Sequence, residues 1–235
     1  MASSFADVEY NYHVICENIA RAAQSVGKSA GDITFLAATK TVDAATINFA
    51  ISLGLAYIGE NRVQELLSKY DEYDLDHASL QFIGHLQTNK VRQIVGKVDL
   101  IQSVDSLRLA REISRCSEKR GVTTDILLEV NIGREENKSG VLPEMLPELI
   151  DQVRQIEAIR VRGLMTIPPI CENAQENCKF FDNMRDIFLD IKAKNIDNIS
   201  MDILSMGMSD DYAEAIRCGA TMVRVGSALF GARHY

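Results

Sequence analysis

Lys40 is the residue whose type and position most directly suggest chemistry in this sequence. It closes the run ITFLAATK, and the small residues before it can partly desolvate its amine, which lowers the pKa of that amine. A neutral lysine amine is a nucleophile that attacks aldehydes to form a Schiff base. The alternative is a lysine at the rim of a fold, with its ammonium group in water.

Two glycine-bearing segments far from Lys40 have the composition of a phosphate site. In the motif SMGMS, the Ser205 hydroxyl can donate to a phosphate oxygen, and the following glycine allows close backbone approach. In VRVGSALFG, Gly226 and Ser227 can offer consecutive amides, and Arg224 points to the same face of a strand as Gly226. A lysine combined with phosphate-binding backbone suggests a site for a phosphorylated aldehyde.

The elements that must position these residues are eight short apolar runs that alternate with longer helical patterns. Most runs are continuously apolar, which is typical of parallel strands buried on both faces. Eight strands with intervening helices predict a (β/α)8 TIM barrel, and a doubly wound open sheet is the alternative. The runs cover residues 33–40, 56–60, 80–85, 100–104, 125–132, 161–167, 200–206 and 221–229.

Helix signals support this alternation. Asp43 is placed as an N-cap, Asp105 or Ser106 opens a further helix, and Ser209 is expected to cap the helix of DDYAEAIRC. Apolar residues in steps of three and four predict an extra N-terminal helix over residues 4–26, packed against the barrel. In such a barrel, functional residues gather at the carboxyl ends of the strands, and phosphate sites commonly follow strands seven and eight.

Composition bounds the function classes. The 235 residues carry no linker-like stretch, which predicts one domain over 1–235, and the net charge of -8 argues against nucleic acid or an anionic membrane as a partner. Five scattered cysteines and four scattered histidines show no metal-ligand spacing. The absence of a signal-peptide pattern or a long apolar run leads us to expect a cytoplasmic protein, with a monomer as the default state.

Seven segments in order resemble the YggS/PROSC family of pyridoxal phosphate-binding proteins across nearly the whole chain. They are LAATKTV, YIGENRVQE, FIGHLQTNK, LLEVNIG with NKSG, RGLMTI, SMGMSDDYAEAI and VRVGSALFGAR. This family is similar to the barrel domain of fold-type III, alanine racemase-like enzymes. The resemblance therefore implies a (β/α)8 fold of the alanine racemase N-terminal domain type, with bound pyridoxal 5′-phosphate.

The resemblance also implies roles for individual residues. Lys40 would form the internal aldimine with the cofactor aldehyde, and Ser205, Gly226 and Ser227 would hold the phosphate. Arg224 would face the pyridine nitrogen, where a permanent positive charge disfavours protonation and weakens the ring as an electron sink.

Three further residues have two readings each. Asn61 would lie beside the cofactor, or it would form a capping pair with Gln64. His85 either faces the barrel mouth or is simply a satisfied side chain, and Lys138 is either a second lysine of the mouth or a solvated loop residue.

The expected function is that of a non-catalytic pyridoxal phosphate carrier in intracellular homeostasis, which holds the cofactor on lysine and passes it to apo-enzymes. The sequence stops at Tyr235, and we expect no second domain to supply the acid/base tyrosine of a racemase. One alternative is a small racemase-like enzyme that uses Tyr57 or Tyr212 instead. The other is a cofactor-free class I aldolase acting through Lys40.

Overall fold

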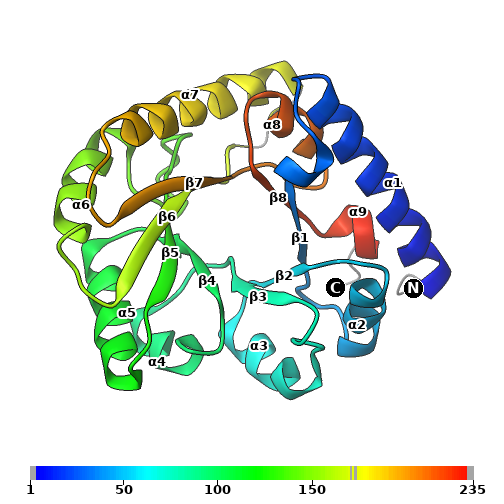
Figure 1. Ribbon diagram of the computed structural model, residues 1–235, viewed down its shortest axis with the longest axis horizontal. Coiled ribbons are helices and arrows are strands. Elements are labelled where there is room, and N and C mark those ends of the chain that lie inside the picture. The colour runs from blue at the N-terminus through cyan, green and yellow to red at the C-terminus, as the bar shows by residue number, and fades with distance from the viewer. Residues whose placement is uncertain (1–3, 170, 172–173, 232–235) are drawn as a thin grey trace.

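The chain forms a closed barrel of eight parallel strands surrounded by helices (Figure 1). This computed structural model describes residues 4–169, 171 and 174–231; Tyr235 and the outermost ends of the expected 1–235 domain lie outside the described residues. Each strand pairs with the next, and β8 pairs with β1 to close the barrel. The strands are β1 (Thr34–Ala38), β2 (Tyr57–Glu60), β3 (Ser79–Phe82), β4 (Leu100–Val104), β5 (Thr124–Glu129), β6 (Ile159–Met165), β7 (Ile199–Ser205) and β8 (Met222–Val225).

Helices occupy the connections between strands and cover the outside of the barrel (Figure 1). They are α1 (Phe5–Gln24), α2 (Ala44–Ser52), α3 (Val63–Lys69), α4 (Val91–Ile94), α5 (Leu107–Arg120), α6 (Leu146–Val153), α7 (Ala174–Ala193), α8 (Tyr212–Arg217) and α9 (Ser227–Phe230). Short 3-10 turns lie at Ala30–Asp32, Tyr70–Glu72, Thr88–Lys90 and Pro143–Met145. No helix in the described part of the chain is both long enough and apolar enough to span a membrane.

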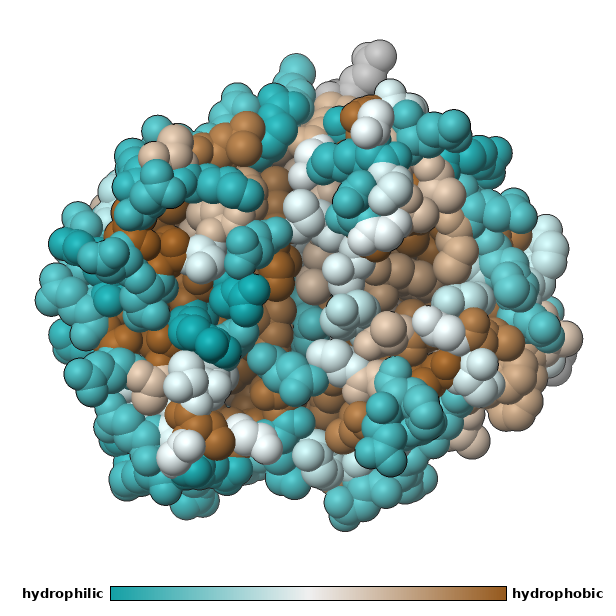
Figure 2. All heavy atoms as spheres, viewed as in Figure 1, coloured by the Kyte–Doolittle hydropathy of each residue, from teal (hydrophilic) through white to brown (hydrophobic). Residues whose placement is uncertain are grey.

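The hydrophobic core has two layers, because each strand directs alternate side chains inward and outward. One large buried cluster, with Phe181 and Ile47 among its members, lies between the strands and the surrounding helices. Two small clusters, around Leu36 and Leu127, contain the side chains that alternate with it and fill the barrel interior. Figure 2 shows hydrophilic residues around the periphery of one face and hydrophobic residues within its hollowed centre.

Helix α1 is an additional element on the barrel's outer surface. The Ser4 hydroxyl accepts from the Asp7 amide, and the Asp7 carboxylate accepts from the Ser4 amide, which together form a capping box. The helix buries Val8, Ile15 and Ile19 and lies beside α8 and α9, as Figure 1 shows. The N-terminal helix predicted over 4–26 is therefore confirmed, and the helix itself covers Phe5–Gln24.

The structure confirms the predicted barrel and shows that the open-sheet alternative is wrong. Each of the eight apolar runs overlaps one strand, and Asp43 and Ser106 accept hydrogen bonds as N-caps of α2 and α5. Two details differ. The last run, 221–229, stops being a strand at Val225, and α8 begins at Tyr212 after Asp211, so Ser209 is not its N-cap.

Candidate functional site

The carboxyl ends of the parallel strands bring the predicted site residues to one end of the barrel. Lys40 lies two residues after β1, and Asn61 directly follows β2. Ser205 is the last residue of β7, and Arg224 lies in β8 immediately before Val225. Because all eight strands run in the same direction around a closed barrel, positions far apart in sequence meet at this mouth.

The closure of the barrel places the segment after β8 next to the segment that carries Lys40. Ala37 pairs with Val225 across this seam. A Cβ atom added at Gly226 would lie 3.0 Å from the Ala38 carbonyl oxygen and 3.3 Å from the Ala38 Cβ. Glycine at position 226 therefore permits a backbone approach that a side chain would obstruct, two residues from Lys40.

Ser209 connects the segment after β7 to the same place. Its Oγ accepts from the backbone N–H of Gly226 and from that of Ala228, each over 3.2 Å. Ser209 thus binds the start of α9, seventeen residues further along the chain. The sequence pattern had instead predicted that it caps α8. Ser227 lies between Gly226 and Ala228 in the sequence. The Ser209 hydroxyl and the backbone N–H groups of this segment therefore lie together beside the segment that carries Lys40.

Arg224 is a buried cation whose position is fixed by two hydrogen bonds. The residue is only 4% exposed. Its Nη1 donates to Ser205 Oγ over 2.7 Å, and its Nη2 donates to the Thr166 carbonyl over 2.8 Å. Burial lowers the pKa of Arg224 to about 10, which leaves the guanidinium charged at neutral pH. A permanent positive charge is therefore held at the mouth of the barrel.

Ser205 has a different set of partners from the one that the sequence suggested. Besides accepting from Arg224, its hydroxyl donates to Gln102 Oε1 over 2.7 Å, and the residue is fully buried. Both contacts hold the arginine in place. Direct contact of Ser205 with a phosphate stays a prediction, whereas Ser209 is the serine that meets the Gly226 amide.

Asn61 does not form the capping pair considered from sequence. Helix α3 begins at Val63, and its N-cap is Arg62, which makes no side-chain capping bond. The Asn61 Oδ1 atom is buried and has no hydrogen-bond partner among the residues that the structure describes. Buried amide oxygens are normally bonded, so this atom is suited to accept a donor from a bound molecule.

Glu129 is a residue of the mouth that the sequence reasoning did not single out. It ends β5 and is 5% exposed, and in the described part of the chain its buried Oε2 atom has no hydrogen-bond partner. Burial, reinforced by the nearby Asp105 carboxylate, raises the pKa of Glu129 to about 7, and the charge of Arg224 opposes that rise. The sequence signal was a carboxylate that follows three apolar residues in the run DILLEVNI, which also begins with Asp125.

The two remaining mouth candidates have ordinary partners. His85 Nδ1 lies 3.3 Å from Ser139 Oγ and 4.0 Å from Asp105 Oδ2, and its side chain is largely exposed. Lys138 Nζ donates to the Pro168 carbonyl over 3.1 Å and pairs with Glu135. Neither geometry singles out a further role.

Comparison with known proteins identifies the family. Residues 11–234 match the family model described as alanine racemase, N-terminal domain. The chain is 43% identical, over 94% of its length and 96% of the relative's, to the pyridoxal phosphate homeostasis protein of Aquifex aeolicus. The chain belongs to the pyridoxal phosphate homeostasis protein family. This confirms the resemblance seen in the sequence motifs.

Solved structures agree with this family assignment. PipY of Synechococcus elongatus, solved with PLP bound, is 33% identical and superposes with a TM-score of 0.80, covering 91% of this chain and all of PipY. Alanine racemase of Corynebacterium glutamicum is only 12% identical, with a TM-score of 0.72 over 98% of this chain and 62% of the racemase, and shows the shared fold. The alanine racemase-type barrel expected from the sequence is thus confirmed.

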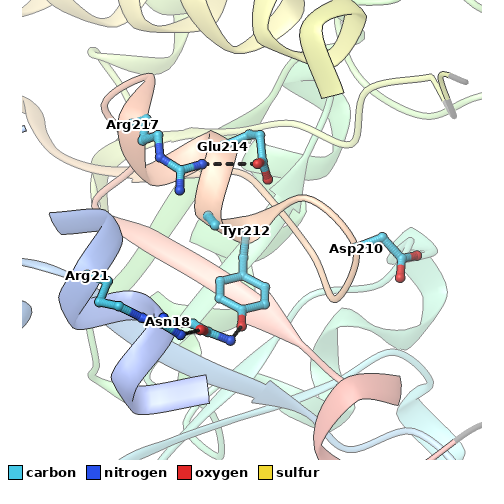
Figure 3. Close-up of a pocket in the computed structure, with 7 residues that line it drawn as sticks. Asn18, Arg21, Asp210, Tyr212, Glu214 and Arg217 are labelled. Atoms are coloured by element: carbon cyan, nitrogen blue, oxygen red, sulfur yellow. Dashed lines mark hydrogen bonds and ion pairs between the residues drawn. The ribbon is translucent and has the colours of Figure 1, made fainter. Parts of the chain in front are cut away.

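The tyrosines proposed as replacement bases lie away from the mouth. Tyr57 is the first residue of β2, at the amino ends of the strands and so opposite Lys40. Tyr212 begins α8 on the outer layer, where Figure 3 shows its hydroxyl directed at Asn18 of α1, whose Nδ2 donates to it over 2.9 Å. Neither side chain is placed to exchange a proton at Lys40.

Proposed function

We propose that this protein binds pyridoxal 5′-phosphate at the mouth of the barrel and acts in intracellular pyridoxal phosphate homeostasis. The observation that carries the proposal is the convergence of the Lys40 segment with the Gly226 amide and the Ser209 hydroxyl, across the seam of β8 and β1. The family names and the PLP-bound relative support the same ligand.

In this proposal Lys40 holds the cofactor covalently. The amine and the cofactor aldehyde condense to a carbon–nitrogen double bond with loss of one water, and addition of water reverses the step. Both halves of a carrier's task, retention and release, follow from this reversibility. The uncharged amine is the form that reacts.

The phosphate would be bound by Gly226, Ser227 and Ser209. A phosphate oxygen can take the position in which the Ser209 hydroxyl now accepts two backbone N–H groups, and the hydroxyl can then turn to donate. Ser205 would act one step behind, through Arg224. Hydrogen bonds to a doubly charged phosphate are stronger than those to a hydroxyl, which favours this exchange.

Arg224 and Asn61 would contact the ring. The buried guanidinium would lie opposite the pyridine nitrogen and keep it unprotonated, so the ring withdraws electrons from an attached carbanion less strongly. The Asn61 Oδ1 atom, which has no hydrogen-bond partner among the described residues, would accept a hydrogen bond from the ring hydroxyl.

A non-catalytic role is the form of the function that we favour, with recipient apo-enzymes as partners, a monomer as the working unit and the cytoplasm as its location. The displaced positions of Tyr57 and Tyr212 support it, because two-base racemisation needs a second proton carrier. Incubation of the purified protein with a panel of L-amino acids tests this. Turnover that disappears in Lys40→Ala would establish the racemase-like alternative.

Borohydride reduction tests the covalent site. Reduction of the protein loaded with pyridoxal phosphate should add one pyridoxyl phosphate group to the peptide that contains Lys40. Lys40→Ala should lose the visible imine absorption, whereas the control Lys138→Ala, which changes the other lysine of the mouth, should retain it. A label on any other lysine in the unaltered protein would contradict the assignment. Trapping that requires an added sugar phosphate would instead indicate the aldolase.

A further inference from the structure

The turn that carries Lys40 has an unusual backbone conformation. It spans Thr39–Val42 and is closed by a hydrogen bond from the Val42 amide to the Thr39 carbonyl over 3.1 Å. Thr41, the residue directly after Lys40, has a φ of +64°. β-branched residues rarely adopt this left-handed region, and such a conformation persists only where the surroundings hold it. The direction of the Lys40 side chain therefore depends on what supports this turn.

Lys69, at the end of α3, supports the turn at both ends. Its Nζ donates to the Thr39 carbonyl over 3.3 Å and to the Val42 carbonyl over 3.0 Å. Its ammonium also contacts Glu65 Oε1 over 3.2 Å, and this carboxylate in turn accepts the Thr41 amide. One cation thus binds the entry and the exit of the turn, and through Glu65 its strained centre.

A buried carboxylate fixes the position of that cation. Glu60, the last residue of β2, is fully buried, and its Oε1 accepts from Lys69 Nζ over 2.6 Å. The same oxygen accepts from Thr39 Oγ1 over 2.8 Å and from the Tyr73 hydroxyl over 2.6 Å. Burial and the Glu60 carboxylate raise the pKa of Tyr73, which keeps its phenol protonated and donating. The support is consequently a connected set of buried polar groups.

We propose that Lys69 is a positioning residue, which holds the turn so that the Lys40 amine meets the cofactor aldehyde in a reactive geometry. This inference rests on the proposed function. The amine of a free turn would sample many directions, and fixing it converts the condensation into a reaction between aligned groups. Without the Lys69 cation, Glu60 and Glu65 would also face each other close to the turn as uncompensated negative charges.

Two ligands separate positioning from general integrity of the site. Pyridoxal 5′-phosphate can form the imine, whereas pyridoxine 5′-phosphate carries an alcohol in place of the aldehyde and binds only noncovalently. Lys69→Met should slow imine formation between about tenfold and a hundredfold, measured by stopped-flow absorbance. Its dissociation constant for pyridoxine 5′-phosphate, measured by calorimetry, should stay at the value of the unaltered protein.

The matched control is Lys194→Met, because Lys194, directly after α7, forms an exposed (i,i+4) pair with Asp190 of that helix. It should leave both measurements unchanged. Glu65→Gln, which keeps the Lys69–Glu60 pair, should slow imine formation in the same direction but less, and it carries the test if Lys69→Met does not fold. Equal losses for both ligands, or no loss for the aldehyde, would overturn the positioning role. Absence of imine in the unaltered protein would instead overturn the proposed function.

Discussion

Replacement of Glu129 by glutamine gives the sharpest test of the electrostatics at the barrel mouth. Glu129 is 5% exposed, no described residue forms a hydrogen bond with its Oε2, and its pKa rises from 4.5 to about 7 because of burial. Glutamine keeps the size and shape of the side chain and cannot ionise. The substitution therefore removes the titration and keeps the packing of the side chain.

The sign of the effect follows from proton binding in the two states. Below about pH 4.5 the carboxyl is protonated in both the folded and the unfolded protein, so it contributes no pH dependence. Between 4.5 and about 7 the unfolded state has lost the proton that the folded state still holds. The free energy of unfolding therefore falls as pH rises through this window. Above it, the folded state carries a buried charge.

The magnitude comes from the same two values. A pKa difference from 4.5 to about 7 corresponds to about 3 kcal/mol, at about 1.4 kcal/mol for each unit. We expect Glu129→Gln to gain up to this amount relative to the unaltered protein on going from about pH 4.5 to about pH 8. For a chain of this size, the gain corresponds to a relative rise in Tm of roughly 6–12 °C. A buried glutamine NH2 group without a partner would lower both ends of the comparison equally, by about 1–3 kcal/mol.

Calorimetric melting of the cofactor-free proteins at several pH values provides the assay. Glu144→Gln is the control, because its exposed carboxylate has a pKa lowered by backbone hydrogen bonding and by Arg134, and its loss cannot produce this gain. A Tm difference between Glu129→Gln and the unaltered protein that does not change with pH would refute the argument. It would mean that Glu129 titrates normally in the folded state, despite its burial beside Asp105.

Two paired substitutions test other parts of the site and the barrel. Ser209→Ala should raise the dissociation constant for pyridoxal 5′-phosphate about tenfold, as expected for one lost charge-assisted hydrogen bond. Ser205→Ala should mainly lower the free energy of unfolding, by about 1–3 kcal/mol, because it leaves a buried Arg224 donor unpaired. Ligand titration and urea denaturation distinguish the two variants, and the reverse pattern would restore Ser205 as the phosphate ligand. Gly163→Ala should prevent stable folding because its Cβ would lie 1.8 Å from the Ile203 carbonyl oxygen. Gly121→Ala, at a position with φ +64° and open space around it, should lower the free energy of unfolding by only about 1 kcal/mol. Similar denaturation midpoints for the two variants would contradict the barrel packing at β6 and β7.

Much of the fold could be predicted from the sequence because parallel barrel strands are apolar on both faces. The run FLAA at positions 35–38 places apolar side chains on both faces of its strand, and the alternation of such runs with helical patterns is a local signal. The boundaries were less accessible. VRVGSALFG is mostly apolar, with Arg224 and Ser227 as its polar residues, yet Gly226 leaves the strand conformation and α9 begins at Ser227. Short apolar runs do not distinguish a strand from the helix that follows it.

The places of the candidate site residues in the fold were predictable where they depend on strand ends and not where they depend on contacts across the barrel. Lys40, Arg224 and Gly226 follow from the rule that function lies at the carboxyl ends of strands. Ser209 was misassigned because a serine ahead of a helical pattern is usually its N-cap, whereas its actual partners belong to a segment seventeen residues away. The competing partner is a tertiary contact that local propensity does not contain.

Carboxylates at the ends of apolar strands are the sequence signal that would have identified Glu60 and Glu129 as residues of interest. Glu60 ends AYIGE and Glu129 ends DILLE, so each acid directly follows a short apolar stretch and is buried at a strand end. Burial of a carboxylate is costly unless a partner or a proton compensates it, and here the two acids use the two different solutions: Glu60 is paired with Lys69, whereas Glu129 binds its proton more tightly. Stability alone would favour an apolar side chain at both positions. The carboxylate of Glu60 instead holds the Lys40 turn through Lys69, and the carboxyl of Glu129 sets the charge near Arg224.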